Sequence, residues 1–76
     1  MADLTLISVD PSINHGQASV KGTRVLVSAI LDCLAGGMSE DEILAEYPTI
    51  TLEGLRAAAA YGAVLAREEV VPVQRE

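Results

Sequence analysis

The chain has 76 residues, half of them hydrophobic, with no Phe or Trp and a net charge of −6 from 11 acidic and 5 basic residues. So short a chain forms one small domain with a thin stability margin, and we expect it to depend on a second subunit. The acidic balance excludes a general basic coat for nucleic acid or an anionic membrane, and a single cysteine excludes an internal disulfide. No apolar run approaches the length of a membrane span, so we expect no membrane contact and a cytoplasmic protein.

Residues 1–26 have the pattern of short strands joined by turns. Leu4 to Val9 alternates in part between apolar and hydroxyl side chains and ends just before an Asp-Pro pair, which predicts one short strand. The turn signal Lys21-Gly22-Thr23 predicts a weak hairpin between residues 18–20 and 24–26. Short strands are marginal in water, so these segments need a sheet partner from elsewhere.

Residues 27–67 have helical periodicity. The first predicted helix starts at Val27, carries apolar residues at i, i+3, i+4 and i+7, and ends at the glycine pair 36–37. The second starts at a capping box in which Ser39 and Glu42 satisfy each other's backbone N–H groups, and Pro48 prevents its continuation.

The third predicted helix starts at the cap Thr51, runs to about Arg67, and is apolar on two sides. One side carries Leu52, Leu55, Ala59, Gly62 and Ala66, and the other carries Ala57, Tyr61, Val64 and Leu65. A helix that is apolar on two sides is usually buried on both. We therefore assign the second set, Ala57, Tyr61, Val64 and Leu65, to the interface of a homodimer.

The second and third helices together have the pattern of a helix-turn-helix, in which the later helix can enter the DNA major groove. The candidate DNA-binding residues are Lys21, Arg24, Thr49, Thr51 and Arg56. A plain three-helix core that binds nothing explains the same pattern equally well. For Arg24 an ion pair or turn contact is the competing interpretation, and for Arg56 the competing interpretation is a surface pair with an acidic neighbour.

The remaining chemistry-bearing residues favour neither catalysis nor a cofactor. His15 stands alone in a predicted loop, Cys33 fits a small buried hydrophobe on the first helix, and no metal-ligand spacing surrounds either residue. We therefore expect no enzyme activity, no metal and no cofactor. Residues 68–76 form a predicted flexible tail whose Val70 to Val73 could add a strand to a partner.

Several short motifs, in this order and spacing, resemble the domain of unknown function 433 family over about residues 6 to 65. They are Lys21-Gly22-Thr23-Arg24-Val25, Gly36-Gly37-Met38-Ser39, Glu42-Ile43-Leu44, Tyr47-Pro48, Ile50-Thr51-Leu52-Glu53, and Ala57-Ala58 with Tyr61. Gly54 departs from the family pattern, and glycine costs about 1 kcal/mol of helix propensity unless a close backbone approach requires it.

The resemblance implies a mainly α fold: a three-helix, homeodomain-like helix-turn-helix bundle with short N-terminal β-strands, arranged as an intertwined homodimer. Members of the family often resemble VapB-type antitoxins, which are paired with a PIN-like ribonuclease toxin. The resemblance thus implies a DNA-binding regulator of a type II toxin–antitoxin pair that neutralises the toxin and autoregulates its operon by binding operator DNA. The alternative is a dimeric protein-interaction module with no DNA binding.

Overall fold

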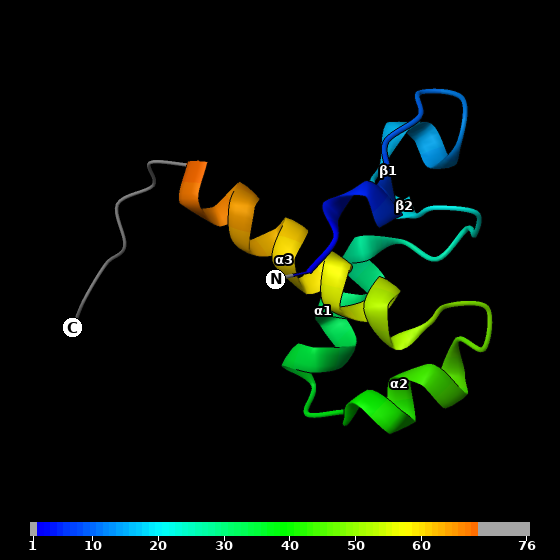
Figure 1. Cartoon of the computed structure of the whole chain (residues 1–76), viewed down its shortest axis with the longest axis vertical. Coiled ribbons are helices and arrows are strands. Elements are labelled where there is room, and N and C mark those ends of the chain that lie inside the picture. Colours follow the sequence, from blue (N-terminus) through cyan, green and yellow to red (C-terminus); the bar gives the residue numbers. More distant parts are fainter. Residues whose placement is uncertain (1, 69–76) are drawn as a thin grey trace.

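The computed structural model describes residues 2–68, which form three α-helices, two short strands and two 3-10 turns (Figure 1). The elements are the 3-10 turn Leu4–Leu6, β1 (Ile7–Ser8), the 3-10 turn Asn14–Gly16, β2 (Ser19–Val20), α1 (Val27–Ala35), α2 (Glu40–Glu46) and α3 (Leu52–Glu68). The longest helix, α3, contacts α1, α2 and both strands, so it is the central element of the described chain. A mainly helical fold with short N-terminal strands, as expected from the sequence, is confirmed.

The first residues differ from the strand predicted over residues 4–9. The Asp3 carboxylate accepts hydrogen bonds from the Thr5 backbone N–H at 3.0 Å and from the Thr5 hydroxyl at 2.6 Å. These two bonds, the hydroxyl bond first, hold the pKa of Asp3 below its ordinary value. Because Asp3 caps them in this way, Leu4–Leu6 form a 3-10 turn, and only Ile7–Ser8 are extended.

The predicted turn at residues 21–23 is present, and it follows β2. Gly22 has φ +80°, a conformation that favours glycine. The Thr23 hydroxyl donates to the Val20 carbonyl at 2.8 Å and accepts from the Val25 N–H at 3.0 Å. The weak hairpin is present as one bridge, between Ser19 and Leu26, and the Val20 N–H donates to the Val25 carbonyl at 2.9 Å. β2 also pairs with β1, in the register Ile7 opposite Val20. The strand thus obtains the partner from elsewhere that its length requires.

The helix termini lie where the sequence signals place them. α1 is followed by Gly37 at φ +91°. At α2 the Ser39 hydroxyl accepts from the Glu42 N–H at 3.1 Å, and the Ser39 N–H donates to the Glu42 carboxylate at 2.8 Å. At α3 the Thr51 hydroxyl accepts from the Gly54 N–H at 3.0 Å. Both predicted N-terminal caps are confirmed.

The core lies where α1, α2 and the first turns of α3 meet β2. Ile30, Ile43 and Leu55 are its largest fully buried side chains. The buried residues of α3 are Gly54, Leu55, Ala57 and Ala58, all in its N-terminal half.

Two alanines of α3 differ in burial from what the sequence pattern suggested. Ala57 is fully buried inside the single chain, so it has no surface to offer a partner. Ala66, assigned to the core side, is exposed. Ala57 lies in the N-terminal half of α3, which the other elements cover, whereas Ala66 lies in the last turns, beyond Ala58, the last buried residue of the described helix.

Candidate interaction surfaces

Two turns lie together at one edge of the molecule because β2 packs against the first turn of α3. A Cβ atom at Gly54 would lie 3.1 Å from Cγ1 of Val20, so the absence of a side chain at Gly54 permits this approach. The turn after Val20 and the turn between α2 and α3 project on the same side of the molecule in Figure 1. We call the exposed residues of these two turns, Lys21, Arg24, Thr49 and Thr51, the turn edge.

The two cations of the turn edge, unlike the residues between them, make no side-chain contact within the described residues that stabilises the turn. Gly22 supplies the left-handed conformation of the turn, and the Thr23 hydroxyl closes it. Lys21 and Arg24 are exposed, and neither side chain forms a hydrogen bond or an ion pair within residues 2–68. The ion pair considered for Arg24 is therefore not found in the described part of the chain.

Arg56 has an acidic partner at the surface, as the competing interpretation expected, and that partner is Glu40. Its guanidinium donates to both carboxylate oxygens of Glu40, at 3.1 and 3.2 Å, and so joins α3 to the first turn of α2. The hydrogen bonds to Glu40 raise the pKa of Arg56. Both side chains remain about half exposed, at 59% and 43%, so solvent screens the pair and its net stabilisation is small.

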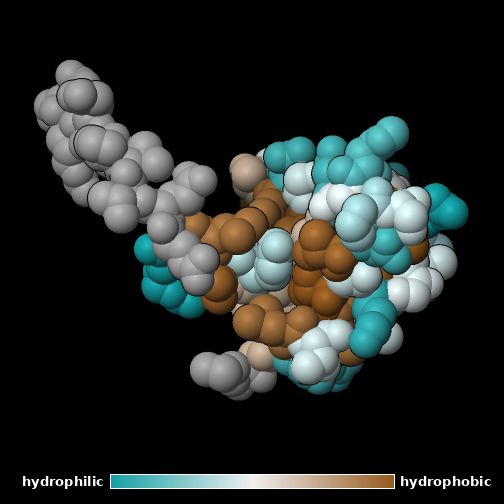
Figure 2. Space-filling view, turned by 90° about the horizontal axis from the view of Figure 1, so that it is seen from above, coloured by the Kyte–Doolittle hydropathy of each residue, from teal (hydrophilic) through white to brown (hydrophobic). Residues whose placement is uncertain are grey.

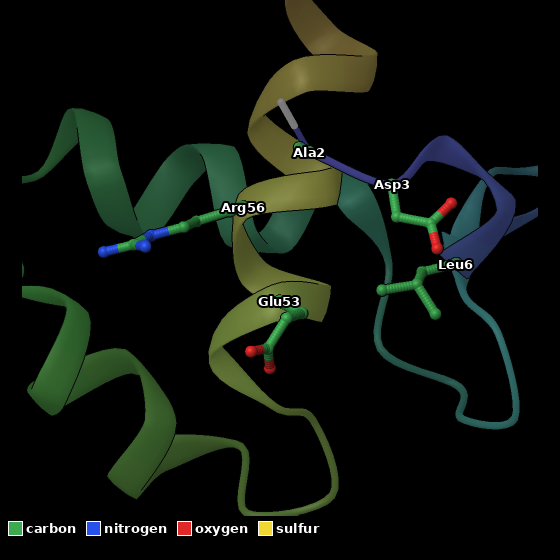
Figure 3. A pocket seen from close by; sticks show the side chains of 5 residues that line it. All are labelled: Ala2, Asp3, Leu6, Glu53 and Arg56. Atoms are coloured by element: carbon green, nitrogen blue, oxygen red, sulfur yellow. The ribbon is translucent and has the colours of Figure 1, made fainter.

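A shallow pocket of about 330 Å³ lies between the N-terminal segment and α3 (Figure 3). Its lining residues are Ala2, Asp3, Leu6, Glu53 and Arg56. In Figure 3 the Arg56 side chain points away from Asp3 and Leu6, so its charge does not neutralise the Asp3 carboxylate directly. The Asp3 carboxylate already accepts two hydrogen bonds from Thr5. We assign no chemistry to this pocket.

A second hollow, the apolar groove, lies between α1, α3 and the segment before β2. It measures about 350 Å³ and is lined by Gln17, Ala18, Val27, Ser28, Leu31, Tyr61, Gly62 and Leu65. Figure 2 shows apolar side chains gathered in the middle of this face, beside the described end of α3. Leu31 reaches α3 closely: a Cβ atom at Gly62 would lie 2.8 Å from its Cδ1 atom.

The residues predicted to form a dimer interface fall into two groups. Tyr61 and Leu65 line the apolar groove, where Tyr61 also packs against the core and Leu65 is 48% exposed. Val64 is half-buried on α3 but is not among the groove's lining residues, and Ala57 lies in the core.

The sequence pattern missed the α1 side of the groove. Val27 and Leu31 share one apolar helical stripe, and that pattern alone does not show which of its members lie at the surface. Val27 is buried, but Leu31 is only half-buried, because α3 covers it along one side. Periodicity gives the apolar side of a helix but not the width that its neighbour covers, so no sequence signal separated Leu31 from the core.

Cys33 and His15 lie apart from both surfaces. Cys33 is half-buried against the core near Tyr47, and interaction with the Cys33 thiol, followed by partial burial, raises the pKa of Tyr47. His15 is exposed in a turn, with φ +57°. Of the helices in the described residues, none has both the length and the apolarity that a bilayer crossing requires.

A protein-family model described as "Protein of unknown function (DUF433)" matches residues 7–62, which is 56 of the 76 residues. Comparison with curated proteins and with solved structures finds no match to the chain. The matched range includes β1, β2, α1, α2 and most of α3, and with them the turn at residues 21–24 and the capping box of α2. It agrees with the motif order that spans residues 6 to 65. The chain belongs to the DUF433 family.

Proposed function

We propose that the protein is a homodimeric, antitoxin-like regulator without catalytic activity, which binds operator DNA through its turn edge and neutralises a PIN-like ribonuclease by protein contact. The observation that carries the DNA part is the packing of Val20 on Gly54. This contact holds the turn that carries Lys21 and Arg24 against the first turn of α3, and the proposal assigns α3 as the recognition helix of a helix-turn-helix. The protein acts in the cytoplasm.

The charge distribution fits binding by a few local contacts. The whole chain carries a charge of −6, so attraction to phosphate requires local cations, and the proposal assigns it to the exposed Lys21 and Arg24 of the turn edge. A homodimer doubles this set to two lysines and two arginines. Thr49 and Thr51 add hydroxyl groups, which commonly contact phosphates.

The test is fluorescence anisotropy with a labelled duplex from the protein's own promoter region, titrated at several salt concentrations. Arg24→Ala is expected to raise the Kd about tenfold, because a hydrogen bond to a charged group contributes about 1.5–3 kcal/mol. It is also expected to reduce the slope of log K against log salt by about one. Lys21→Ala is expected to have a similar salt effect.

Arg67→Ala is the matched control, because Arg67 is exposed near the opposite end of α3 and its loss changes the net charge equally. Its Kd is expected to stay within about twofold of the wild-type value. Equal effects of Arg24→Ala and Arg67→Ala, or equal affinity for promoter and random duplexes, would exclude a specific DNA site at the turn edge.

The second candidate is a dimeric protein-interaction module that binds no DNA. It is favoured by the pairing of Arg56 with Glu40, which occupies the one cation of the first half of α3. The predicted tail, residues 68–76, could supply such a contact by adding a strand to a partner, and residues 69–76 lie outside the described residues. Deleting residues 69–76 and measuring binding to the co-expressed ribonuclease tests this candidate. Unchanged binding would exclude the tail as the toxin contact.

A further inference from the structure

The buried side of α3 continues beyond the elements that cover it. Ala58 and Leu65 lie seven residues, or two helical turns, apart and therefore on the same side of the helix. Ala58 is fully buried, whereas Leu65 is 48% exposed. The last turns of α3 project past the rest of the described chain in Figure 1. The apolar side of this helix thus ends in an uncovered leucine at the rim of the apolar groove.

The apolar groove is uncharged along its whole lining. Its eight residues include no Asp, Glu, Lys or Arg, in a chain with a net charge of −6. Leu4 and Val9 are the other exposed large hydrophobic residues of the described chain, and neither lines the groove. Only at the groove, among the described residues, does an exposed leucine lie beside an apolar hollow.

This absence of charge points to a second copy of the chain as the occupant. Two copies that each carry a charge of −6 repel one another, so their contact requires a surface free of carboxylates. Leu65 is at once a projecting side chain and a wall of the groove, so one surface supplies both halves of a two-fold contact. We propose that each copy seats its Leu65 in the apolar groove of the other, against Leu31 and Tyr61.

This inference rests on the homodimer of the proposed function and adds the two surfaces that meet. It assigns Leu31 on α1, together with Gln17 and Ser28 at the polar rim, to the interface. Val64, which does not line the groove, lies outside the contact that the inference describes.

The test is sedimentation equilibrium of the full chain over a range of concentrations, without DNA. The wild type is expected to approach twice the 8.0 kDa of one chain. Leu65→Asp places two carboxylates in the apolar contact and is expected to weaken association about a hundredfold or more. The matched control is Ala63→Asp, because Ala63 is exposed and lies about 200° round the helix from Leu65. It adds the same charge and is expected to associate as the wild type does.

A dilution series of wild-type NMR spectra gives a readout that needs no substitution. The methyl signals of Leu31 and Leu65 are expected to shift with concentration, and those of the remote Leu4 are not. This measurement decides the question even if the Leu65→Asp chain does not fold.

Three results would overturn the inference. A wild-type chain that sediments as a single copy at every concentration removes the homodimer as well, but leaves the Arg24 test of DNA binding intact. Equal association of Leu65→Asp and Ala63→Asp leaves a homodimer whose contact lies elsewhere. Loss of association on deleting residues 69–76, with no shift of the Leu31 methyl signals, makes the tail the dimer contact in place of Leu65 and the groove.

Discussion

Gly54 shows how one missing side chain can position a candidate binding surface. It stands in the first turn of α3, where glycine is unfavourable for the helix by about 1 kcal/mol relative to alanine. In return, Val20 approaches until its Cγ1 atom lies 3.1 Å from where a Cβ atom would stand. Val20 is 5% exposed, and its branched side chain has little freedom to move aside. The glycine therefore holds the turn at residues 21–24 against α3.

Replacing Gly54 with Ala is expected to destabilise the protein by about 1 kcal/mol, since overpacking against Val20 outweighs the gain in helix propensity. In a Val20→Ala background the same replacement is expected to stabilise the protein by up to about 1 kcal/mol, because the close contact is gone. Urea unfolding of the four chains of this cycle measures the coupling free energy. A coupling near zero would show that Gly54 and Val20 do not constrain each other.

The sequence predicted some residue roles and missed others for identifiable reasons. From the sequence, Gly54 was expected to be favourable only where another group approaches its backbone closely. In the structure the Val20 side chain makes that approach. The Arg56 partner was missed because Glu40 lies 16 residues away, and its proximity depends on how α2 and α3 dock. The burial of Ala57 was missed because an alanine fits either side of a helix that is apolar on both.

The short helix α2 depends on its capping box more than a longer helix would. It has only seven residues, and short helices are marginal without tertiary packing. Its single buried residue is Ile43. The reciprocal bonds of Ser39 and Glu42 satisfy two backbone N–H groups at its start, where Glu40, Asp41 and Glu42 also favour the positive end of the helix dipole.

Ser39→Ala is expected to lower the free energy of unfolding by about 1 kcal/mol, because the Glu42 N–H loses its acceptor. Ser39→Asp, which keeps a side-chain acceptor at the same position, is expected to stay close to the wild type. Chemical denaturation followed by circular dichroism measures both. If the two variants lose equal stability, the hydroxyl of Ser39 does not act as the cap.

The elements that the sequence predicted well are those with a local chemical signal at their ends. The bounds of α1, α2 and α3 follow from a glycine pair, a capping box, a proline and a threonine cap. The predicted strand over residues 4–9 was wrong in its first half, because partial alternation carries no information about the cap that Asp3 provides. The pairing of β1 with β2 could not be predicted either, since it depends on a contact between segments separated by the loop at residues 9–18.

In the described chain the uncharged apolar groove lies beside the last turns of α3, and the turn that carries the exposed cations Lys21 and Arg24 lies beside its first turn. A domain of this size has little stability to spare, so in the proposed homodimer the cover of Leu65 and the groove is expected to contribute a large share of the total. We therefore expect the single chain to be markedly less stable than the homodimer, so that thermal unfolding is coupled to dissociation.

Coupled unfolding predicts that the melting temperature rises with protein concentration, because dilution favours the separated chains. With about 0.7 kcal/mol of unfolding enthalpy per residue, two chains unfolding together gain about 5 °C for each tenfold increase in concentration. Calorimetry over a hundredfold range of concentration measures this slope. Ser39→Ala serves as the control, because losing a cap within each chain lowers the Tm at every concentration by about 6 °C and leaves the slope unchanged. A wild-type Tm that does not change with concentration would show that the single chain folds without help from a second copy.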